Sequence, residues 1–379
     1  MRIFIEADSM SWEKMSGIGY TTYSLVKKLD KMVGSRDDIT VYIIVPFERR
    51  KFVREMGLKS VNIKYLPPIY KYVNFLLVRL PIKIPIDLFF GTGVYIFPNY
   101  KNWYVPFSKS ITFIHDLSFI KFADTVEPKN KAYLQQNIER WMKQTDKIIC
   151  ISHSTKRDLL DQFPQVREKA EVIHLGVDTS IYKPYASSVI SKTQTELGLP
   201  SEYILYVGNI EPRKNLGVLL DAYEELSKRK SKVPPLLIVG GGGWSNDDIL
   251  ERIEYLKKSG LNIIVPTRYI DQASLSIIMS GASILVHPAF YEGFGLPVLE
   301  GMASGIPVIA GRTSSIPEVA AETIYYFDAA SSKSLVETIQ FVIDNPKSRS
   351  EITRAARRRA KEFSWNDVAT KLLDVASGL

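Results

Sequence analysis

The segment 287–300 contains a glycine-rich turn between an apolar run and a proline. The apolar run 283–286 predicts a buried strand, and Pro297 predicts the start of a helix. Amide groups at the start of a helix have no partner within the helix and lie at the positive end of its dipole, so they bind anions such as phosphate without a charged side chain. We therefore expect a phosphate-binding turn formed by Gly293, Phe294, Gly295 and Leu296.

Two glutamates flank this turn in an E-x7-E spacing. Glu292 is expected in the loop before the turn, and Glu300 in the first turn of the helix behind it. Carboxylates accept hydrogen bonds from vicinal hydroxyl groups, which both ribose and hexose offer. A carboxylate on each side of a diphosphate therefore suits a nucleotide sugar. The same residues also fit an ordinary strand–turn–helix unit, in which Glu300 only complements the helix dipole.

Two adjacent cations, Arg213 and Lys214, lie between a strand-like run and a helical one. Cations are unfavourable at the positive end of a helix unless an anion lies between them, so this position favours diphosphate binding. The alternative is solvated surface charge, which is common for both residue types.

The amino-terminal half holds two further candidate features. His115 ends the apolar run 111–114, at the carboxyl edge of a predicted parallel strand, where ligands bind in open α/β sheets. A single histidine is also a common structural residue. Gly17 and Gly19 follow the first predicted strand and precede a helix, so their backbone could approach a bound phosphate or sugar, although a plain strand–helix turn has the same pattern.

Together these motifs resemble the donor site of the retaining glycosyltransferases of family GT4, which use nucleotide sugars and have the GT-B fold, two Rossmann-like domains facing across a cleft. The resemblance implies that Glu292 contacts the transferred sugar and that Glu300 contacts the ribose. It also implies that His115 approaches the donor sugar and that an arginine and a lysine clamp the diphosphate. It covers nearly the whole chain and is strongest from 203 to 319.

The sequence departs from the family pattern at two places. In the family's G-R-x4-K-G motif, Lys214 matches the lysine, Asn209 replaces the arginine, and Arg213 precedes the lysine. Whether Arg213 takes over the role of the missing guanidinium is open at this point. The P-R-K-N variant resembles a mannosyltransferase-like branch of the family. Arg268 stands where the family commonly has a glycine beside the nucleobase, and it either binds the donor or lies on the surface.

The order of predicted elements indicates an α/β protein, because strand-like runs alternate with helical ones in both halves. We predict strands at 2–7, 39–45, 111–114, 147–151, 203–207, 236–239, 263–265, 283–286 and 307–310, and helices that include 19–30, 131–144 and 216–229. Ser315 and Glu318 predict a capping box at a helix start. The resemblance implies an acceptor-side domain at 1–183, a donor-binding domain at 184–362, and a terminal helix at 363–379 that crosses back to the first domain.

Composition narrows the class of protein. The net charge of +8 and the pI near 9.2 permit nucleic acid, an anionic membrane or an acidic substrate, but no nucleic-acid recognition motif is present, so we expect no nucleic-acid partner. The single cysteine, Cys150, excludes a disulfide within the chain. No apolar run is long enough to cross a bilayer, which predicts a cytoplasmic protein. The basic and aromatic segment 65–90 fits a peripheral membrane contact, an acceptor wall or a packed loop.

We expect a metal-independent retaining hexosyltransferase. The chain has no D-x-D carboxylate pair, the usual way in which Mg²⁺ or Mn²⁺ is presented to a nucleotide sugar in the other major glycosyltransferase fold, so we expect no metal and no other cofactor. The expected donor is GDP-mannose, and the expected acceptor is a saccharide or a lipid-linked molecule at the inner membrane face. The alternatives are a UDP-sugar donor, carrying glucose or N-acetylglucosamine, and an inactive subunit that only binds a nucleotide sugar. An NAD-dependent oxidoreductase is disfavoured because no G-x-G-x-x-G follows the first strand.

Overall fold

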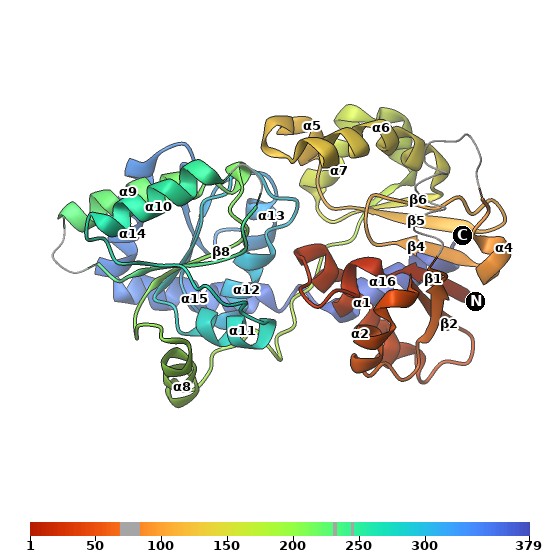
Figure 1. Cartoon of the computed structure of the whole chain (residues 1–379), viewed down its shortest axis with the longest axis horizontal. Helices are drawn as coiled ribbons and strands as arrows, with labels where there is room; N and C mark the ends of the chain where they lie inside the picture. The colour runs from red at the N-terminus through yellow and green to blue at the C-terminus, as the bar shows by residue number, and fades with distance from the viewer. Residues whose placement is uncertain (69–83, 230–232, 244–245) are drawn as a thin grey trace. The chain divides into compact units, whose positions relative to one another are not determined.

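A computed structural model describes residues 1–68, 84–229, 233–243 and 246–379 of the chain (Figure 1). The chain forms two compact units. Unit 1 comprises Met1–Leu117, Ala132–Gly176 and Trp365–Leu379, and unit 2 comprises Ser118–Lys131 and Val177–Ser364. Of the basic and aromatic segment 65–90, residues 69–83 lie outside the described residues.

Unit 1 contains a seven-stranded parallel sheet in the order β3-β2-β1-β4-β5-β6-β7. Its strands are β1 (Arg2–Glu6), β2 (Thr40–Pro46), β3 (Asn62–Leu66), β4 (Val94–Phe97), β5 (Lys109–Ile114), β6 (Lys147–Cys150) and β7 (Ala170–Val172). Every residue of β4 is buried, as expected for a strand covered on both faces of a parallel sheet. Cys150 is a buried free thiol at the end of β6.

Helices of unit 1 connect these strands. They are α1 (Gly17–Val33), α2 (Arg50–Glu55), α4 (Asp87–Phe90), α6 (Pro128–Gln144), α7 (His153–Gln162) and α16 (Trp365–Ser377), while the short α5 (Ser118–Lys121) groups with unit 2. The first predicted helix, 19–30, is confirmed within α1. The strands β3, β4 and β7 were not among the predicted ones.

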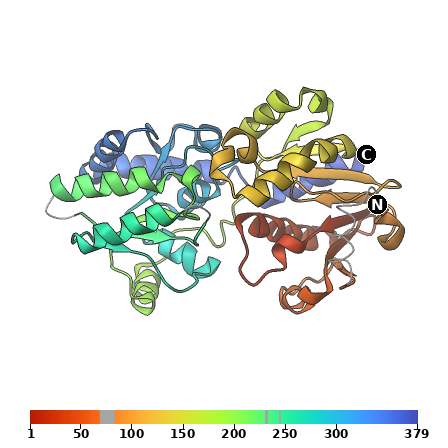
Figure 2. The same cartoon turned by 45° about the horizontal axis from the view of Figure 1, so that its top comes forward.

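The terminal helix α16 packs against α1 in unit 1, which confirms the predicted return of the chain to the first domain. Its buried residues are spaced as one face of an amphipathic helix: Val368, Ala369, Leu372, Leu373 and Ala376. The two ends of the chain lie near one another in unit 1, as Figure 2 shows, and Ser377 Oγ is 4.0 Å from Met1 Sδ.

Unit 2 contains a six-stranded parallel sheet in the order β10-β9-β8-β11-β12-β13. Its strands are β8 (Ile204–Val207), β9 (Leu236–Val239), β10 (Ile263–Ile264), β11 (Ile284–His287), β12 (Val308–Gly311) and β13 (Tyr325–Phe327). All but β13 were predicted from the sequence. The strand order reverses between β8 and β11, and ligands bind at the carboxyl ends of strands at such a reversal. Two parallel-sheet Rossmann-like units confirm the predicted α/β fold class.

Helices cover both faces of this sheet, with α9 and α10 on one face and α11 and α12 on the other (Figure 1). The helices of unit 2 are α8 (Ser187–Leu197), α9 (Leu216–Arg229), α10 (Asp247–Lys258), α11 (Gln272–Ser280), α12 (Leu296–Ser304), α13 (Ile316–Ala320), α14 (Ser332–Asp344) and α15 (Pro346–Ala360). One buried cluster includes side chains of β8, β9, α9 and α14, so the strands and helices of this face share a core.

A close backbone contact fixes the loop that follows β8. A Cβ atom added to Gly240, just after β9, would lie 1.8 Å from the carbonyl oxygen of Gly208, just after β8. Only a residue without a side chain therefore fits at 240 while the two strand ends keep their spacing. The backbone amide of Ile210 also donates to the Gly241 carbonyl at 3.2 Å.

Gly240→Ala is expected to lower the free energy of unfolding by about 2–3 kcal/mol, because the added methyl group forces β8 and β9 apart at their ends. Gly241→Ala is the matched control, since its Cβ would meet only Asn209 Oδ1 at an ordinary 3.7 Å. Chemical denaturation of both variants measures the difference. Equal stabilities would contradict the close contact.

Candidate functional site

The loop after β8 carries Arg213 and Lys214 in a short 3-10 helix, Pro212–Lys214, directly before α9. Asn215 then adopts a left-handed conformation with φ of 54°. Its side-chain amide donates to the Pro288 carbonyl at 3.1 Å and to the Ala329 carbonyl at 2.8 Å. The predicted strand–loop–helix context of these cations is confirmed, and Asn215 ties their loop to the segment that follows β11.

Glu292 is the centre of the charged cluster in unit 2. Its carboxylate is buried, and Oε1 accepts hydrogen bonds from Lys214 Nζ and from His287 Nε2, the latter at 2.8 Å. Arg213 Nη1 lies 3.7 Å from Oε2. Burial alone would raise the pKa of Glu292, but Lys214, His287 and Arg213 together hold that pKa far below its usual range. The structure therefore places an ionised carboxylate among cations at the carboxyl edge of the sheet.

Two serines hold the backbone of Glu292. Its amide donates to Ser314 Oγ at 2.8 Å, and Ser315 Oγ donates to its carbonyl at 2.9 Å. The predicted capping box at Ser315 and Glu318 is wrong, because the Ser315 side chain makes no capping hydrogen bond at the start of α13. The Ser315 hydroxyl binds the Glu292 carbonyl instead.

The glycine turn and the helix behind it are confirmed. Gly295 precedes α12 with φ of +93°, and a Cβ atom there would lie 2.4 Å from Ile316 Cδ1, so both conformation and packing require glycine. Pro297 is the second residue of α12. Gly293 and Phe294 are buried, and Leu296 begins the helix.

The expected place of Glu300 needs a correction. It lies beyond the first turn of α12, which contains no acidic residue, so it does not simply complement the helix dipole. Its half-buried carboxyl group accepts a hydrogen bond from the Tyr182 side chain. Burial raises the pKa of Glu300 to about 8, and the hydrogen bond from Tyr182 only partly opposes this rise.

Asn209 and Arg268, the two departures from the family pattern, both lie in unit 2. Asn209 Nδ2 donates to Glu211 Oε1 at 3.3 Å, and Arg213 Nε lies 3.2 Å from Oε2 of the same glutamate. Arg268 is exposed, and its guanidinium donates to the Glu196 carbonyl at 2.7 Å, near the end of α8. Their predicted contacts with a donor stay predictions.

The remaining candidates belong to unit 1. Gly17 and Gly19 are the first and third residues of α1, so they lie within the helix start and not in a loop before it. Gly19 is required by packing, because a Cβ atom there would lie 2.5 Å from the Ser9 carbonyl oxygen. Around Gly17 no described atom comes within 4 Å of such a Cβ, which leaves open space at the helix start.

His115 follows β5 and is buried. Its Nε2 lies 2.7 Å from the Pro98 carbonyl oxygen, after the neighbouring strand β4. A carbonyl can only accept, so Nε2 carries the hydrogen and Nδ1 holds the lone pair of the neutral ring. Burial lowers the pKa of His115, and this effect exceeds the opposite effects of the hydrogen bond to Pro98 and the charge of Asp116, which raise it. Its predicted meeting with the unit 2 residues stays a prediction.

Five residues that hold this site are not among the predicted site residues: Tyr182, Asn215, His287, Ser314 and Ser315. His287 ends β11 in the same way as His115 follows β5, so the argument from strand ends could have found it. Tyr182 and Ser314 are far in sequence from the glutamates that they contact, and no local pattern indicates them.

Two family models match consecutive parts of the chain. The model described as Glycosyltransferase Family 4 matches residues 15–181, and the model described as Glycosyl transferases group 1 matches residues 190–359. The chain is a glycosyltransferase of the family 4 type.

Relatives of this glycosyltransferase act on different substrates. O-antigen chain mannosyltransferase B of Escherichia coli is 26% identical over 276 residues, covering 72% of each chain. The D-inositol 3-phosphate glycosyltransferase of Streptomyces avermitilis is 26% identical over 289 residues, covering 73% of this chain and 61% of the relative. This chain therefore spans less than two thirds of the Streptomyces protein.

Solved structures share the fold of this glycosyltransferase at low identity. Anabaena HepE in complex with UDP and glucose has a TM-score of 0.74 at 16% identity, with all of both chains covered. Sucrose-phosphate synthase of Thermosynechococcus elongatus has a TM-score of 0.73 at 18% identity, covering 100% of this chain and 98% of the other. Within the described part of the glycosyltransferase, no helix has both the length and the apolar character needed to cross a membrane.

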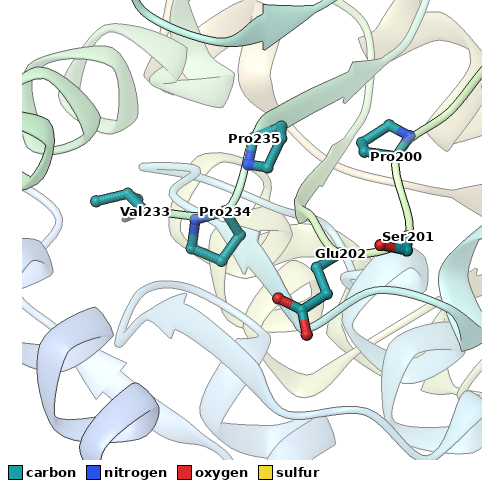
Figure 3. A pocket seen from close by; sticks show the side chains of 6 residues that line it. All are labelled: Pro200, Ser201, Glu202, Val233, Pro234 and Pro235. Atoms are coloured by element: carbon teal, nitrogen blue, oxygen red, sulfur yellow. The ribbon is translucent and has the colours of Figure 1, made fainter. Parts of the chain in front are cut away.

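A separate shallow pocket of about 290 Å³ opens at the other end of the unit 2 sheet (Figure 3). It is lined by Pro200, Ser201, Glu202, Val233, Pro234 and Pro235. These residues precede β8 and β9, so the pocket lies at the amino ends of the strands, whereas Lys214 and Glu292 follow the carboxyl ends. None of the predicted site residues of the glycosyltransferase lines it.

Glu300→Gln is expected to flatten the pH dependence of stability. A carboxyl group whose pKa rises on folding, here from 4.5 to about 8, keeps its proton longer in the folded state, so stability falls as pH rises through this window. The neutral amide removes this loss, and melting temperatures of the variant should exceed those of the wild type above pH 8 and match them near pH 4.5.

The matched control is Glu351→Gln, an exposed position on α15. It should keep the wild-type profile. Some decrease of melting temperature with rising pH should remain in every variant, because burial also raises the pKa of Glu6, to about 7. A Glu300→Gln profile that parallels the wild type would contradict the burial of this carboxyl group.

Proposed function

We propose that this glycosyltransferase transfers a hexose from a nucleotide sugar to a saccharide or lipid-linked acceptor, with mannose from GDP-mannose as the donor. The observation that carries the proposal is the buried Glu292 carboxylate between Lys214 and Arg213, at the point where the strand order of unit 2 reverses. The mannosyltransferase from Escherichia coli supports the choice of mannose. The HepE complex supports a second candidate, a UDP-sugar donor such as UDP-glucose.

The charges suit departure of a nucleoside diphosphate. Lys214 and Arg213 are already fixed beside the glycine turn, and the first amides of α12 have no partner within the helix. Cations and amide dipoles that are oriented before the reaction stabilise the charge that develops on the leaving diphosphate. Such a leaving group needs no strong general acid. We expect these groups to replace a metal ion.

Glu292 is suited to hold the hydroxyl groups of the transferred sugar, because an ionised carboxylate accepts hydrogen bonds from neutral hydroxyls. Glu300 is the proposed partner of the ribose. His115 would offer Nδ1 to the sugar, since Nε2 is held by the Pro98 carbonyl. Transfer with retention of configuration, by attack on the face that the diphosphate leaves, is part of the proposal.

Lys214→Ala is expected to weaken binding of the nucleotide sugar roughly 30-fold or more, because charge-assisted hydrogen bonds to the diphosphate are lost. Calorimetry with GDP-mannose, UDP-glucose and UDP-N-acetylglucosamine would measure the loss and identify the preferred donor. Lys228→Ala, an exposed lysine paired with Glu224 on α9, is the matched control and should bind as the wild type does.

Unchanged affinity of Lys214→Ala for every donor would refute the site. Binding without transfer or donor hydrolysis, measured by mass spectrometry of the products, would favour the inactive nucleotide-sugar-binding subunit.

Donor binding is expected to be unchanged by metal removal. Lys214 and Arg213 supply the countercharge in this proposal. Donor affinities measured in an excess of EDTA should therefore agree within about twofold with those measured in Mg²⁺ or Mn²⁺. A loss of binding in EDTA that Mg²⁺ or Mn²⁺ restores would contradict metal independence.

A further inference from the structure

We infer that His287 is a positioning residue for Glu292, which holds Oε1 so that Oε2 is presented to a hydroxyl group of the transferred sugar. This inference rests on the proposed function and adds a residue to the same site. Neither the family resemblance nor the motif spacing assigns a role to this histidine.

The position of His287 is fixed by the sheet. It is the last residue of β11, its backbone is in register with Ala310 of β12, and its side chain is 2% exposed. The ring therefore has little freedom to turn. Its Nε2 lies 2.8 Å from Glu292 Oε1. A carboxylate can only accept a hydrogen bond, so Nε2 carries the hydrogen.

The second ring nitrogen argues against a role in packing alone. Among the described residues, His287 Nδ1 has no hydrogen-bond partner, although it is buried. A buried polar atom without a partner is unfavourable, and an apolar residue at this position would avoid that penalty. The contact between Nε2 and Glu292 is thus the interaction that distinguishes histidine from an apolar side chain here.

The hydrogen bonds are divided unequally between the two oxygens of Glu292. Oε1 accepts from both His287 and Lys214, whereas Arg213 Nη1 lies 3.7 Å from Oε2, beyond hydrogen-bond distance. Oε2 is therefore the oxygen with capacity for a further donor. A sugar hydroxyl is such a donor.

His287 also has a function when the diphosphate arrives. In the proposed function Lys214 binds the diphosphate. Movement of Lys214 toward a phosphate oxygen would weaken the hydrogen bond from Lys214 to Glu292 Oε1. His287 cannot follow, because its ring is fixed at the end of β11. It keeps one strong hydrogen bond on Oε1, so the carboxylate stays ionised and oriented while the lysine serves the phosphate.

The test compares nucleotide sugars with their nucleoside diphosphates. For GDP-mannose against GDP, and UDP-glucose against UDP, the ratio of the two dissociation constants isolates the contribution of the sugar. In His287→Phe, which keeps a planar ring without the N–H, the affinity for the nucleotide sugar relative to the diphosphate should fall about tenfold. Affinity for the diphosphate alone should stay within about twofold of the wild type.

His287→Gln provides the conservative rescue, because its amide can again donate to Oε1, and it should recover most of the ratio. It also keeps the test valid if the phenylalanine does not fit, with thermal melting reporting the fold. His153→Phe, the same change at an exposed histidine at the start of α7, should leave the ratio unchanged.

Three outcomes overturn the inference. In the first, His287→Phe has the same ratio of dissociation constants as the wild type, while Glu292→Gln loses the contribution of the sugar. This result refutes the positioning role of His287 and leaves the proposed function standing. An equal loss for sugar nucleotides and diphosphates shows a structural role only. A wild type that binds none of the four nucleotides overturns the proposed function together with this inference.

Discussion

The structure of unit 2 depends on one buried charge. A carboxylate as buried as that of Glu292 is strongly unfavourable unless cations and hydrogen-bond donors surround it. Lys214, His287 and Arg213 meet this requirement. The same requirement fixes the loops that carry these residues, so the buried carboxylate of Glu292 also determines how the ends of β8 and β11 are held together.

The two glutamates of one motif have opposite environments. Cations hold the pKa of Glu292 far below its usual range, whereas burial with the Tyr182 hydrogen bond leaves the pKa of Glu300 raised to about 8. Environments that separate the pKa values of two carboxyl groups usually mark different roles. An ionised Glu292 can only accept hydrogen bonds, while a protonated Glu300 can also donate one.

Close backbone packing supports this arrangement of charges. Gly240 lets the ends of β8 and β9 approach, and Gly295 lets α12 begin against Ile316. In unit 1, α16 covers α1 after the chain has passed through unit 2, so the first unit is complete only when the last residues have folded onto it. Positioning of the site thus relies on contacts between segments distant in the sequence.

The sequence by itself determined the α/β class, five strands of unit 2 and the glycine turn before α12. These features follow from hydrophobic periodicity and from turn and helix-start residues, which are properties of neighbouring residues. It did not reveal the strands β3, β4, β7 and β13, although β3 and β4 are at least as long as strands of unit 2 that were predicted. Only the tertiary structure decided that Ser315 binds the Glu292 backbone and does not cap α13. Only the tertiary structure showed that Lys214 and His287 both donate to Oε1 of Glu292. Ion pairs and pKa values depend on distances in space between residues that are far apart in the chain.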